Sequence, residues 1–258
     1  MSPSTYSLLF ASGLFLSMLL LLEVGRRYGI RRLADDSEGA RQGFGVVDGA
    51  VFSLLGLLIA FTFSGAAGRF DGRRQLIIEE ANDIATAYLR IDLLPAAAQP
   101  ALRALFRQYV ESRLETYRKL PDVEGAKREL AHSVKLQGEI WSTAVAACRE
   151  AGSTPLHLLL LSGLNQMIDI TTTRTEGAKI HPPLIIFVML GILTLSASLL
   201  AGFGMAGGRS RSWIHIFVFA AVMAITVYVI LDVEYPRFGF IRIDGTDRVL
   251  QELRESMK

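Results

Sequence analysis

The chain has a single cysteine and almost no net charge, and each absence excludes a class of protein. Cys148 alone cannot supply an intramolecular disulfide framework or a multi-cysteine zinc or iron–sulfur site. The 27 basic and 25 acidic residues nearly cancel, so the overall charge gives no reason to expect nucleic acid as a partner. Because Cys148 falls on an apolar helical stripe, we expect it to pack in a core.

The motifs of common catalytic and metal sites are also missing. The sequence contains no Gly-rich phosphate loop, no Gly-x-Ser-x-Gly elbow and no His-Glu-x-x-His. Glu129 and His132 have the Glu-x-x-His spacing of helical di-iron sites, but such sites need a second copy and further inward-facing glutamates. We therefore expect neither an enzyme nor a bound metal or cofactor.

Apolar sequence is abundant, since 51% of the 258 residues are hydrophobic, too many for an ordinary soluble domain. A bilayer core of about 30 Å is crossed by about 20 apolar helical residues. Four stretches approach that length, and we expect them to be transmembrane helices: 6–22, 47–67, 184–203 and 213–231. The first lacks a cleavage pattern and is followed, not preceded, by basic residues, so we expect it to be retained.

The order of these spans predicts an all-α membrane protein with two pairs of transmembrane helices around a polar helical domain. Residues 1–67 would form the first pair and residues 181–232 the second, a hairpin with a glycine-rich turn. Residues 68–180 would form an antiparallel bundle in which the short apolar run 156–161 is a buried core helix. Residues 233–258 would form a tail that docks on the bundle.

Apolar residues recur at helical spacing through the bundle and define the faces that we expect to be buried. The first face runs on from the second span to Leu94: Ile77, Ile78, Ala81, Ile84, Ala85, Tyr88 and Ile91. The next comprises Leu102, Leu105, Phe106, Tyr109, Leu114 and Tyr117. The third comprises Leu130, Val134, Trp141, Val145 and Cys148.

Basic residues do not settle which side of the membrane holds the bundle. An excess of Lys and Arg in short loops normally marks the cytoplasmic side. Such residues are dense in the first connection, as in Arg26, Arg27 and Arg31, but Arg69 and Arg174 are among similar numbers on the bundle side. The count tilts slightly towards an external bundle and leaves the orientation open.

The second span carries the most informative pattern. Ser53, Gly56, Ala60 and Ser64 share one helical face, which lets neighbouring helices approach closely, with Leu57 and Phe61 near that face. A ring of such apolar side chains from several subunits would gate ions by dewetting. Alternation of small and large residues for intramembrane packing is the other interpretation, and the residues alone favour it.

Carboxylates near this helix are further candidates. Asp48 lies at the mouth of the span, where a carboxylate either serves the site or faces headgroup water. Glu79, Glu80 and Asp83 form an acidic patch close to Arg73 and Arg74, and pairing at three or four residues along the helix explains it without a ligand.

The second span resembles a known family. Gly56-x-x-x-Ala60-Phe61, followed by Arg69-Phe70-Asp71 and then Arg73, is similar to the second transmembrane helix of bestrophins and their bacterial relatives. Residues 69–95 and the tail 235–244 resemble the bacterial bestrophin-like family catalogued as a domain of unknown function. With the two-plus-two helix order, the resemblance covers most of the chain.

The resemblance implies an ion channel subunit in a homo-oligomer, a pentamer by analogy, with the second helix of each protomer lining the pore. It places Ser53, Leu57 and Phe61 at the three hydrophobic neck positions, of which Ser53 departs in character. Candidate residues for the pore mouth or for selectivity are Asp48, Arg69 and Arg73. No acidic cluster matches the family's calcium clasp.

Partners and location follow from the same resemblance. It favours small monovalent ions, anions above cations, with membrane lipid as the other partner, and it places the bundle in the cytoplasm. The lack of disulfides suits a multi-pass protein of the bacterial inner membrane. A non-conducting membrane sensor or scaffold that binds a partner through its bundle is the alternative.

Overall fold

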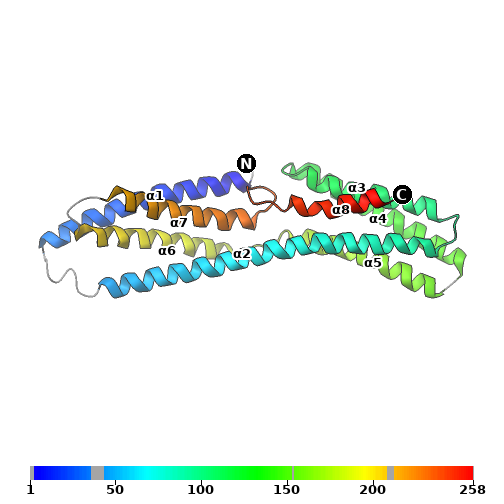
Figure 1. The fold of residues 1–258 in the computed structure, drawn as a ribbon, viewed down its shortest axis with the longest axis horizontal. Helices are drawn as coiled ribbons and strands as arrows, with labels where there is room; N and C mark the ends of the chain where they lie inside the picture. The colour runs from blue at the N-terminus through cyan, green and yellow to red at the C-terminus, as the bar shows by residue number, and fades with distance from the viewer. Residues whose placement is uncertain (1–2, 36–43, 153, 208–211, 258) are drawn as a thin grey trace. The chain divides into compact units, whose positions relative to one another are not determined.

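The computed structural model describes residues 3–35, 44–152, 154–207 and 212–257. Within these residues the regular structure is entirely helical, as Figure 1 shows, and four helices are long and apolar enough to cross a membrane. The predicted all-α transmembrane fold class is therefore confirmed. The chain divides into two compact units: a membrane unit of residues 1–69 and 181–240, and a bundle unit of residues 70–180 and 241–258.

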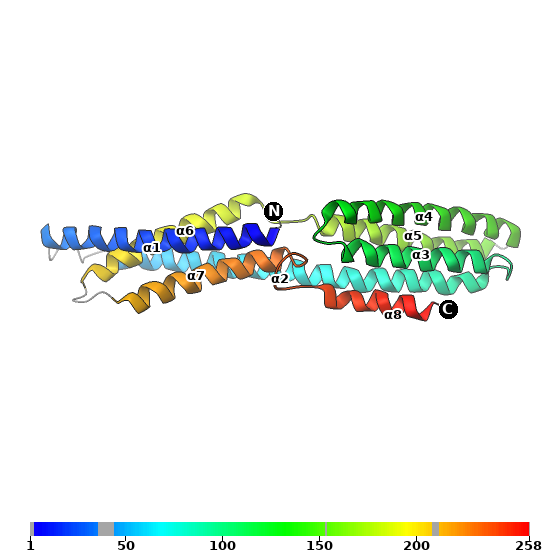
Figure 2. The ribbon, with the colours of Figure 1, turned by 90° about the horizontal axis from the view of Figure 1, so that it is seen from above.

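The membrane unit contains α1 (Pro3–Asp35), the first part of α2 (Phe44–Leu89), α6 (Leu184–Gly204) and α7 (Trp213–Glu234). The short helix η3 (Met205–Gly207) follows α6. Figures 1 and 2 show α1 side by side with both α6 and α7, the two helices against which it packs. The core of this unit is therefore built mainly around α1.

Two glycines allow α1 and α6 to approach backbone to backbone. A Cβ atom built on Gly25 would overlap the carbonyl oxygen of Leu199, and one built on Gly202 would overlap the carbonyl oxygen of Leu22. Small residues at a helix crossing permit this separation in a membrane, where close van der Waals packing replaces the hydrophobic effect. The pair Gly25 and Gly202 fixes the crossing point of the two helices.

The bundle unit contains the rest of α2, η2 (Arg90–Leu93), α3 (Gln99–Arg118), α4 (Val123–Ala151) and α5 (Thr154–Gly177). Its C-terminal part is η4 (Asp244–Asp247) followed by α8 (Arg248–Ser256), which packs on α3 with Leu250 fully buried. The core unites apolar side chains of α2, α3, α4, α5 and α8. Figure 2 shows α3, α4 and α5 running side by side.

Helix ends in the bundle carry the expected signals. The side chain of Asp122 caps α4 by accepting a hydrogen bond of 3.0 Å from the backbone N–H of Gly125. At the other end of α4, Gly152 adopts φ 66°, the left-handed conformation in which glycine avoids the strain of a Cβ atom. Cys148 lies in the last turn with its side chain buried in the core, as expected, and burial raises the pKa of its thiol.

Apart from Cys148, the predicted buried face of α4 is wrong. Val134 is 55% exposed, and Leu130, Trp141 and Val145 are only partly buried. The buried face is turned away from these residues and comprises Ser133, Leu136, Gln137, Ile140, Ala144 and Ala147. It was missed because small and polar residues make up most of it, so hydrophobicity alone does not mark it.

The apolar run 156–161 at the start of α5 is only partly the buried core helix that we predicted. Leu160 is buried and Leu161 is partly buried, but Leu158 and Leu159 are 70% and 51% exposed. A continuous apolar run on a helix points in every direction, so a helix packed on one side leaves some of it uncovered.

The helix α2 is unbroken over 46 residues. At about 1.5 Å per residue it is about 69 Å long, more than twice the thickness of a bilayer core of about 30 Å. Only its apolar first half can therefore lie in the membrane. As expected from the periodicity, the same helix continues into the bundle unit.

Candidate functional site

The membrane half of α2 leaves one face uncovered within the protomer. Ser53, Leu57 and Phe61 recur every four residues and are all exposed, Leu57 by 51% and Phe61 by 68%. Gly56, Ala60 and Ser64 adjoin them and are exposed too. The structure thus brings the neck candidates together on one stripe, and their own protomer does not occlude them.

The opposite face of the same segment packs inside the protomer. Leu55, Thr62 and Ala66 are buried, and their spacing of seven and four residues places them on one side of the helix. The hydroxyl of Thr62 donates to the carbonyl oxygen of Leu58 at 2.5 Å, which satisfies a polar group where water is absent. One face of α2 is therefore fixed against the protomer and the other remains for a partner, lipid or water.

The candidate residues for the pore mouth differ in their burial and in the hydrogen bonds that their charged groups make. Asp48 is half-buried at the start of the span. Arg69 makes three hydrogen bonds of 2.7 to 3.0 Å with the carboxylate of Glu234, which is fully buried at the end of α7. Arg73 is buried and donates to the carbonyl oxygen of Ile180 at 2.9 Å. Both arginines therefore make structural hydrogen bonds within the protomer in addition to carrying charge.

Glu234 also holds His181, which precedes α6. His181 Nδ1 lies 2.9 Å from Glu234 Oε1, and the imidazole contacts the ring of Tyr235 with centroids 4.6 Å apart and the two planes tilted by 31°. One buried carboxylate thus joins α2, the residue ahead of α6 and the end of α7. Glu234 is not among the candidate residues predicted from the sequence.

The acidic patch on α2 is not a single cluster. Glu79 is exposed and Asp83 is half-buried, whereas Glu80 is fully buried. The expected pairing of Glu80 along its own helix is wrong, because its carboxylate contacts Arg113 of α3 and Arg174 of α5. Glu79 and Glu80 are neighbours in the sequence and so point about 100° apart around the helix, which lets Glu80 enter the core while Glu79 faces outward.

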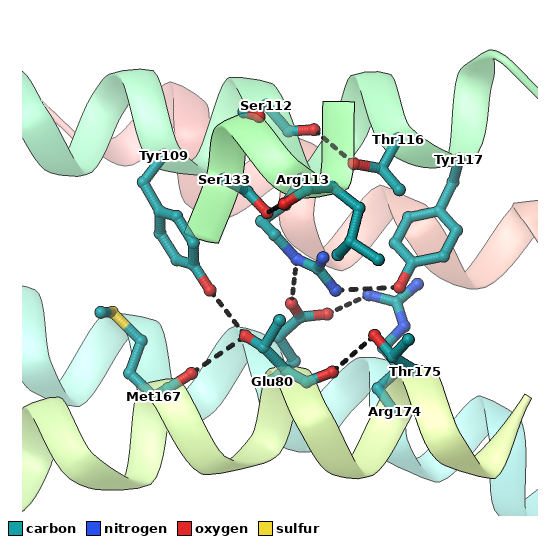
Figure 3. Close-up of polar contacts among 12 residues, drawn as sticks. Glu80, Tyr109, Ser112, Arg113, Thr116, Tyr117, Ser133, Met167, Arg174 and Thr175 are labelled. Carbon is teal, nitrogen blue, oxygen red and sulfur yellow. Dashed lines mark hydrogen bonds and ion pairs between the residues drawn. The ribbon is translucent and has the colours of Figure 1, made fainter. Parts of the chain in front are cut away.

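Figure 3 shows the buried charge network around Glu80. Glu80 Oε1 accepts from Arg113 Nε at 2.5 Å, and Glu80 Oε2 accepts from Arg174 Nη1. Arg174 Nη2 also donates to Asp247 of η4 at 3.1 Å. We call these four residues the Glu80 network. Two carboxylates and two guanidiniums balance in charge, which is how buried charges are tolerated.

Tyr117 contacts both arginines of the network. Its hydroxyl accepts from Arg113 Nη2 at 2.9 Å, and the guanidinium of Arg174 lies 3.8 Å from the centre of its ring. Burial lowers the pKa of Arg113, but Tyr117, Glu80 and Tyr109 outweigh it, so the pKa is raised above its usual value. The guanidinium therefore stays charged, and the network ties α2, α3, α5 and the segment before α8.

A second polar cluster crosses the bundle at Tyr109. Its hydroxyl lies 2.8 Å from Thr171 Oγ1, and Gln137 Nε2 donates to both oxygens at 3.0 Å. Burial raises the pKa of Tyr109 to about 12. This cluster connects α3, α4 and α5 and explains why Gln137 belongs to the buried face of α4.

Replacing Tyr109 with phenylalanine should lower stability by about 1 to 2 kcal/mol, because Gln137 and Thr171 would lose a buried partner. Thermal unfolding of the detergent-solubilised protein, followed by circular dichroism, measures the change. Tyr28→Phe is a matched control, since Tyr28 is 58% exposed. Equal melting temperatures for the two variants would contradict a stabilising role for the cluster.

The Glu129 and His132 pair forms no metal site in the described chain. Glu129 accepts from Lys119 Nζ at 2.7 Å and from Ser112 Oγ at 3.0 Å, while His132 is exposed. Among the described residues no group of three His, Cys, Asp or Glu side chains is placed to hold a metal ion.

Known proteins share both the sequence pattern and the fold of this chain. A family model described as Bestrophin-like domain matches residues 13–246. A point-mutated form of a bacterial bestrophin homologue from Klebsiella pneumoniae has a similar fold, with a TM-score of 0.66, 15% identity and coverage of 93% of this chain and 98% of its own. The homologue from the same organism solved by zinc phasing gives a TM-score of 0.64 at 16% identity, covering 92% and 97%. No curated protein matches.

Proposed function

Since the chain belongs to the bestrophin-like family, we propose that it is a subunit of a homo-oligomeric ion channel whose pore is lined by α2 of each protomer. The uncovered face of α2 carries the proposal. Only 11% of the most apolar stretch of this helix is buried, against 22% to 28% in the other three spans. A helix that its own protomer leaves so bare is suited to an oligomer axis.

The composition of that face supports a pore more than a lipid contact. Ser53, Gly56, Ala60 and Ser64 give it small and partly polar character, which a lipid-facing surface does not need. Leu57 and Phe61 would project from each protomer and form the narrow apolar neck. Such a constriction controls conduction through its hydration.

The proposal also covers the permeant ion and the number of subunits in the oligomer. We favour a pentamer in the bacterial inner membrane, with the bundle unit in the cytoplasm and small monovalent ions, anions above cations, as the permeant species. Asp48, Arg69 and Arg73 are the candidates that bias selectivity at the mouth. Because Glu234 balances the charge of Arg69, that arginine would contribute less field than a free side chain.

Phe61→Ala should raise ion flux by about tenfold, the effect of lowering a barrier by about 1.4 kcal/mol, because a wider neck is easier to hydrate. Liposomes containing the purified oligomer, under chloride and then potassium gradients, measure the flux and its sign. Leu57→Ala should act in the same direction.

Phe63→Ala is the matched control for this experiment. Phe63 is 45% exposed on the same helix but lies on nearly the opposite side from Phe61. Equal flux in the Phe61 and Phe63 variants would overturn the proposed neck. Oligomers that conduct nothing in any variant would favour the sensor or scaffold that binds through its bundle.

A further inference from the structure

A groove runs between α1 and α7 of the membrane unit, and none of the described residues that line it belongs to α2. It consists of two hollows of about 340 and 440 Å³ that share Leu8 and Tyr228. Together they follow α1 from Thr5 to Leu16 and α7 from Tyr228 back to Ala221. The two volumes fall in the range of about 300 to 1,000 Å³ typical of ligand sites.

The walls of this groove suit a hydrocarbon. None of the described residues that line the two hollows is charged. Ala11 and Ala224 are buried beneath the second hollow, and their small side chains leave the space that larger residues would fill. Since the groove lies on transmembrane helices, an apolar occupant replaces lipid contacts without losing hydrogen bonds.

The two ends of the groove differ in polarity. At one end Asp232 Oδ1 accepts from the Tyr228 hydroxyl at 3.1 Å and from the Phe240 backbone N–H at 3.2 Å. The Phe240 ring is 87% exposed there, beyond the end of α7. At the other end, partway along both helices, Phe15 meets Phe217 with ring centroids 6.5 Å apart. The groove therefore has a polar mouth and an apolar end within the span.

The length of the groove matches one leaflet of a bilayer. Thr5 and Leu16 are eleven residues apart on α1, or about 16 Å at about 1.5 Å per residue, close to half of a core of about 30 Å. Tyrosine side chains such as that of Tyr228 at the mouth collect at the level of the headgroups. A helix of a second copy would need a partner surface along the whole of α1 and would gain nothing from a polar end.

We propose that this groove binds one acyl chain of a membrane phospholipid, with the headgroup at the mouth formed by Thr5, Tyr228 and Phe240. The site would belong to the leaflet at which α7 ends and α1 begins. It does not rest on the proposed function, because a protein that conducts no ions would still hold the lipid.

Quenching of tryptophan fluorescence by brominated acyl chains tests whether one chain occupies the groove. The two native tryptophans, Trp141 and Trp213, are first replaced by phenylalanine. Phe15→Trp then places the reporter in the groove, and Val222→Trp places it on the 55% exposed face beside Ala221 as the control. Each protein is reconstituted in phosphatidylcholine vesicles with a rising fraction of chain-brominated phosphatidylcholine.

The groove reporter should lose fluorescence in direct proportion to the brominated fraction, as one bound chain requires. The control, surrounded by several lipids, should lose it more steeply. A groove reporter that pure brominated lipid does not quench would overturn the proposal, because protein would then cover the groove. The same steep curve for both reporters would also overturn it, because the groove would then be ordinary lipid boundary.

A pair of variants of equal size provides the second measurement. Ala221→Phe fills the groove, whereas Val222→Phe adds the same ring on the neighbouring exposed position. Native mass spectrometry of the detergent-purified protein should show retained phosphatidylcholine in the wild type and in Val222→Phe, and its loss in Ala221→Phe. Retention by all three proteins, or by none, contradicts a lipid held in this groove.

Discussion

Glu80→Gln should cost the bundle about 3 to 5 kcal/mol of unfolding free energy, the usual effect of breaking a buried ion pair. Glutamine is nearly isosteric with glutamate, so the loss would come from charge. Arg113 and Arg174 would remain buried with only Asp247 to balance them. Thermal unfolding of the full-length protein in detergent, followed by circular dichroism, measures the loss.

Glu79→Gln is the matched control for this variant, because Glu79 is the preceding residue of the same helix and is exposed. Its effect should stay within about 0.5 kcal/mol. If both glutamine variants unfold at the same temperature, the Glu80 network does not stabilise the bundle.

A double variant separates charge balance from other causes. Replacing Glu80 and Arg113 together with methionine removes one charge of each sign and leaves Arg174 paired with Asp247. Apolar replacement of a complete buried pair is often neutral or stabilising, so the double variant should be more stable than Glu80→Gln. A double variant less stable than the single one would mean that the contacts of Glu80, not its charge, are what matters.

Gly202→Ala is expected to destabilise the membrane unit by at least about 3 kcal/mol, at the upper end of the usual cost of overpacking. The new methyl group would overlap the backbone of Leu22, and a carbonyl cannot rotate away as a flexible side chain can. The helices α1 and α6 would have to separate. Thermal unfolding and the size of the oligomer, by gel filtration in detergent, report the effect.

Gly191→Ala, on the same helix, should increase stability instead of lowering it. A Cβ atom there meets nothing within 4 Å, so the higher helix propensity of alanine should add up to about 1 kcal/mol of stability. The two substitutions are chemically identical and differ only in what faces them. If both raise stability, α1 and α6 do not touch through their backbones.

The helical fold class could be predicted from the sequence because it depends on properties that are local along the chain. A run of about 20 apolar residues spans a bilayer whatever surrounds it. The face of α2 with Ser53, Leu57 and Phe61 could also be predicted as a unit, because spacing along one helix decides which side chains share a side.

The Glu80 network could not be predicted with the same rules, although a signal was present. Arg113 falls on the apolar stripe of α3 between Tyr109 and Tyr117, four residues from each, and Glu80 falls on the apolar stripe of α2. A charge within an apolar stripe indicates a buried partner elsewhere. Which helix supplies that partner depends on tertiary packing, since 94 residues separate Glu80 from Arg174.

The buried face of α4 was predicted wrongly for a related reason. Hydrophobicity selected Val134 and Trp141, but Ser133 and Gln137 are buried because hydrogen bonds satisfy them. Ser133 bonds to a carbonyl of its own helix, whereas the partners of Gln137 lie on two other helices. Only the partner of Ser133 is local in the sequence.

The burial of Cys148 makes the native protein almost inert to thiol reagents. It is the one thiol of the chain, its side chain is 2% exposed, and its raised pKa keeps it protonated. A cysteine introduced on an exposed face, such as Ser53→Cys, could therefore carry a spin label or a fluorophore without further engineering. For the proposed oligomer, distances between labels on different protomers would then count the subunits and test whether their α2 helices surround a common space.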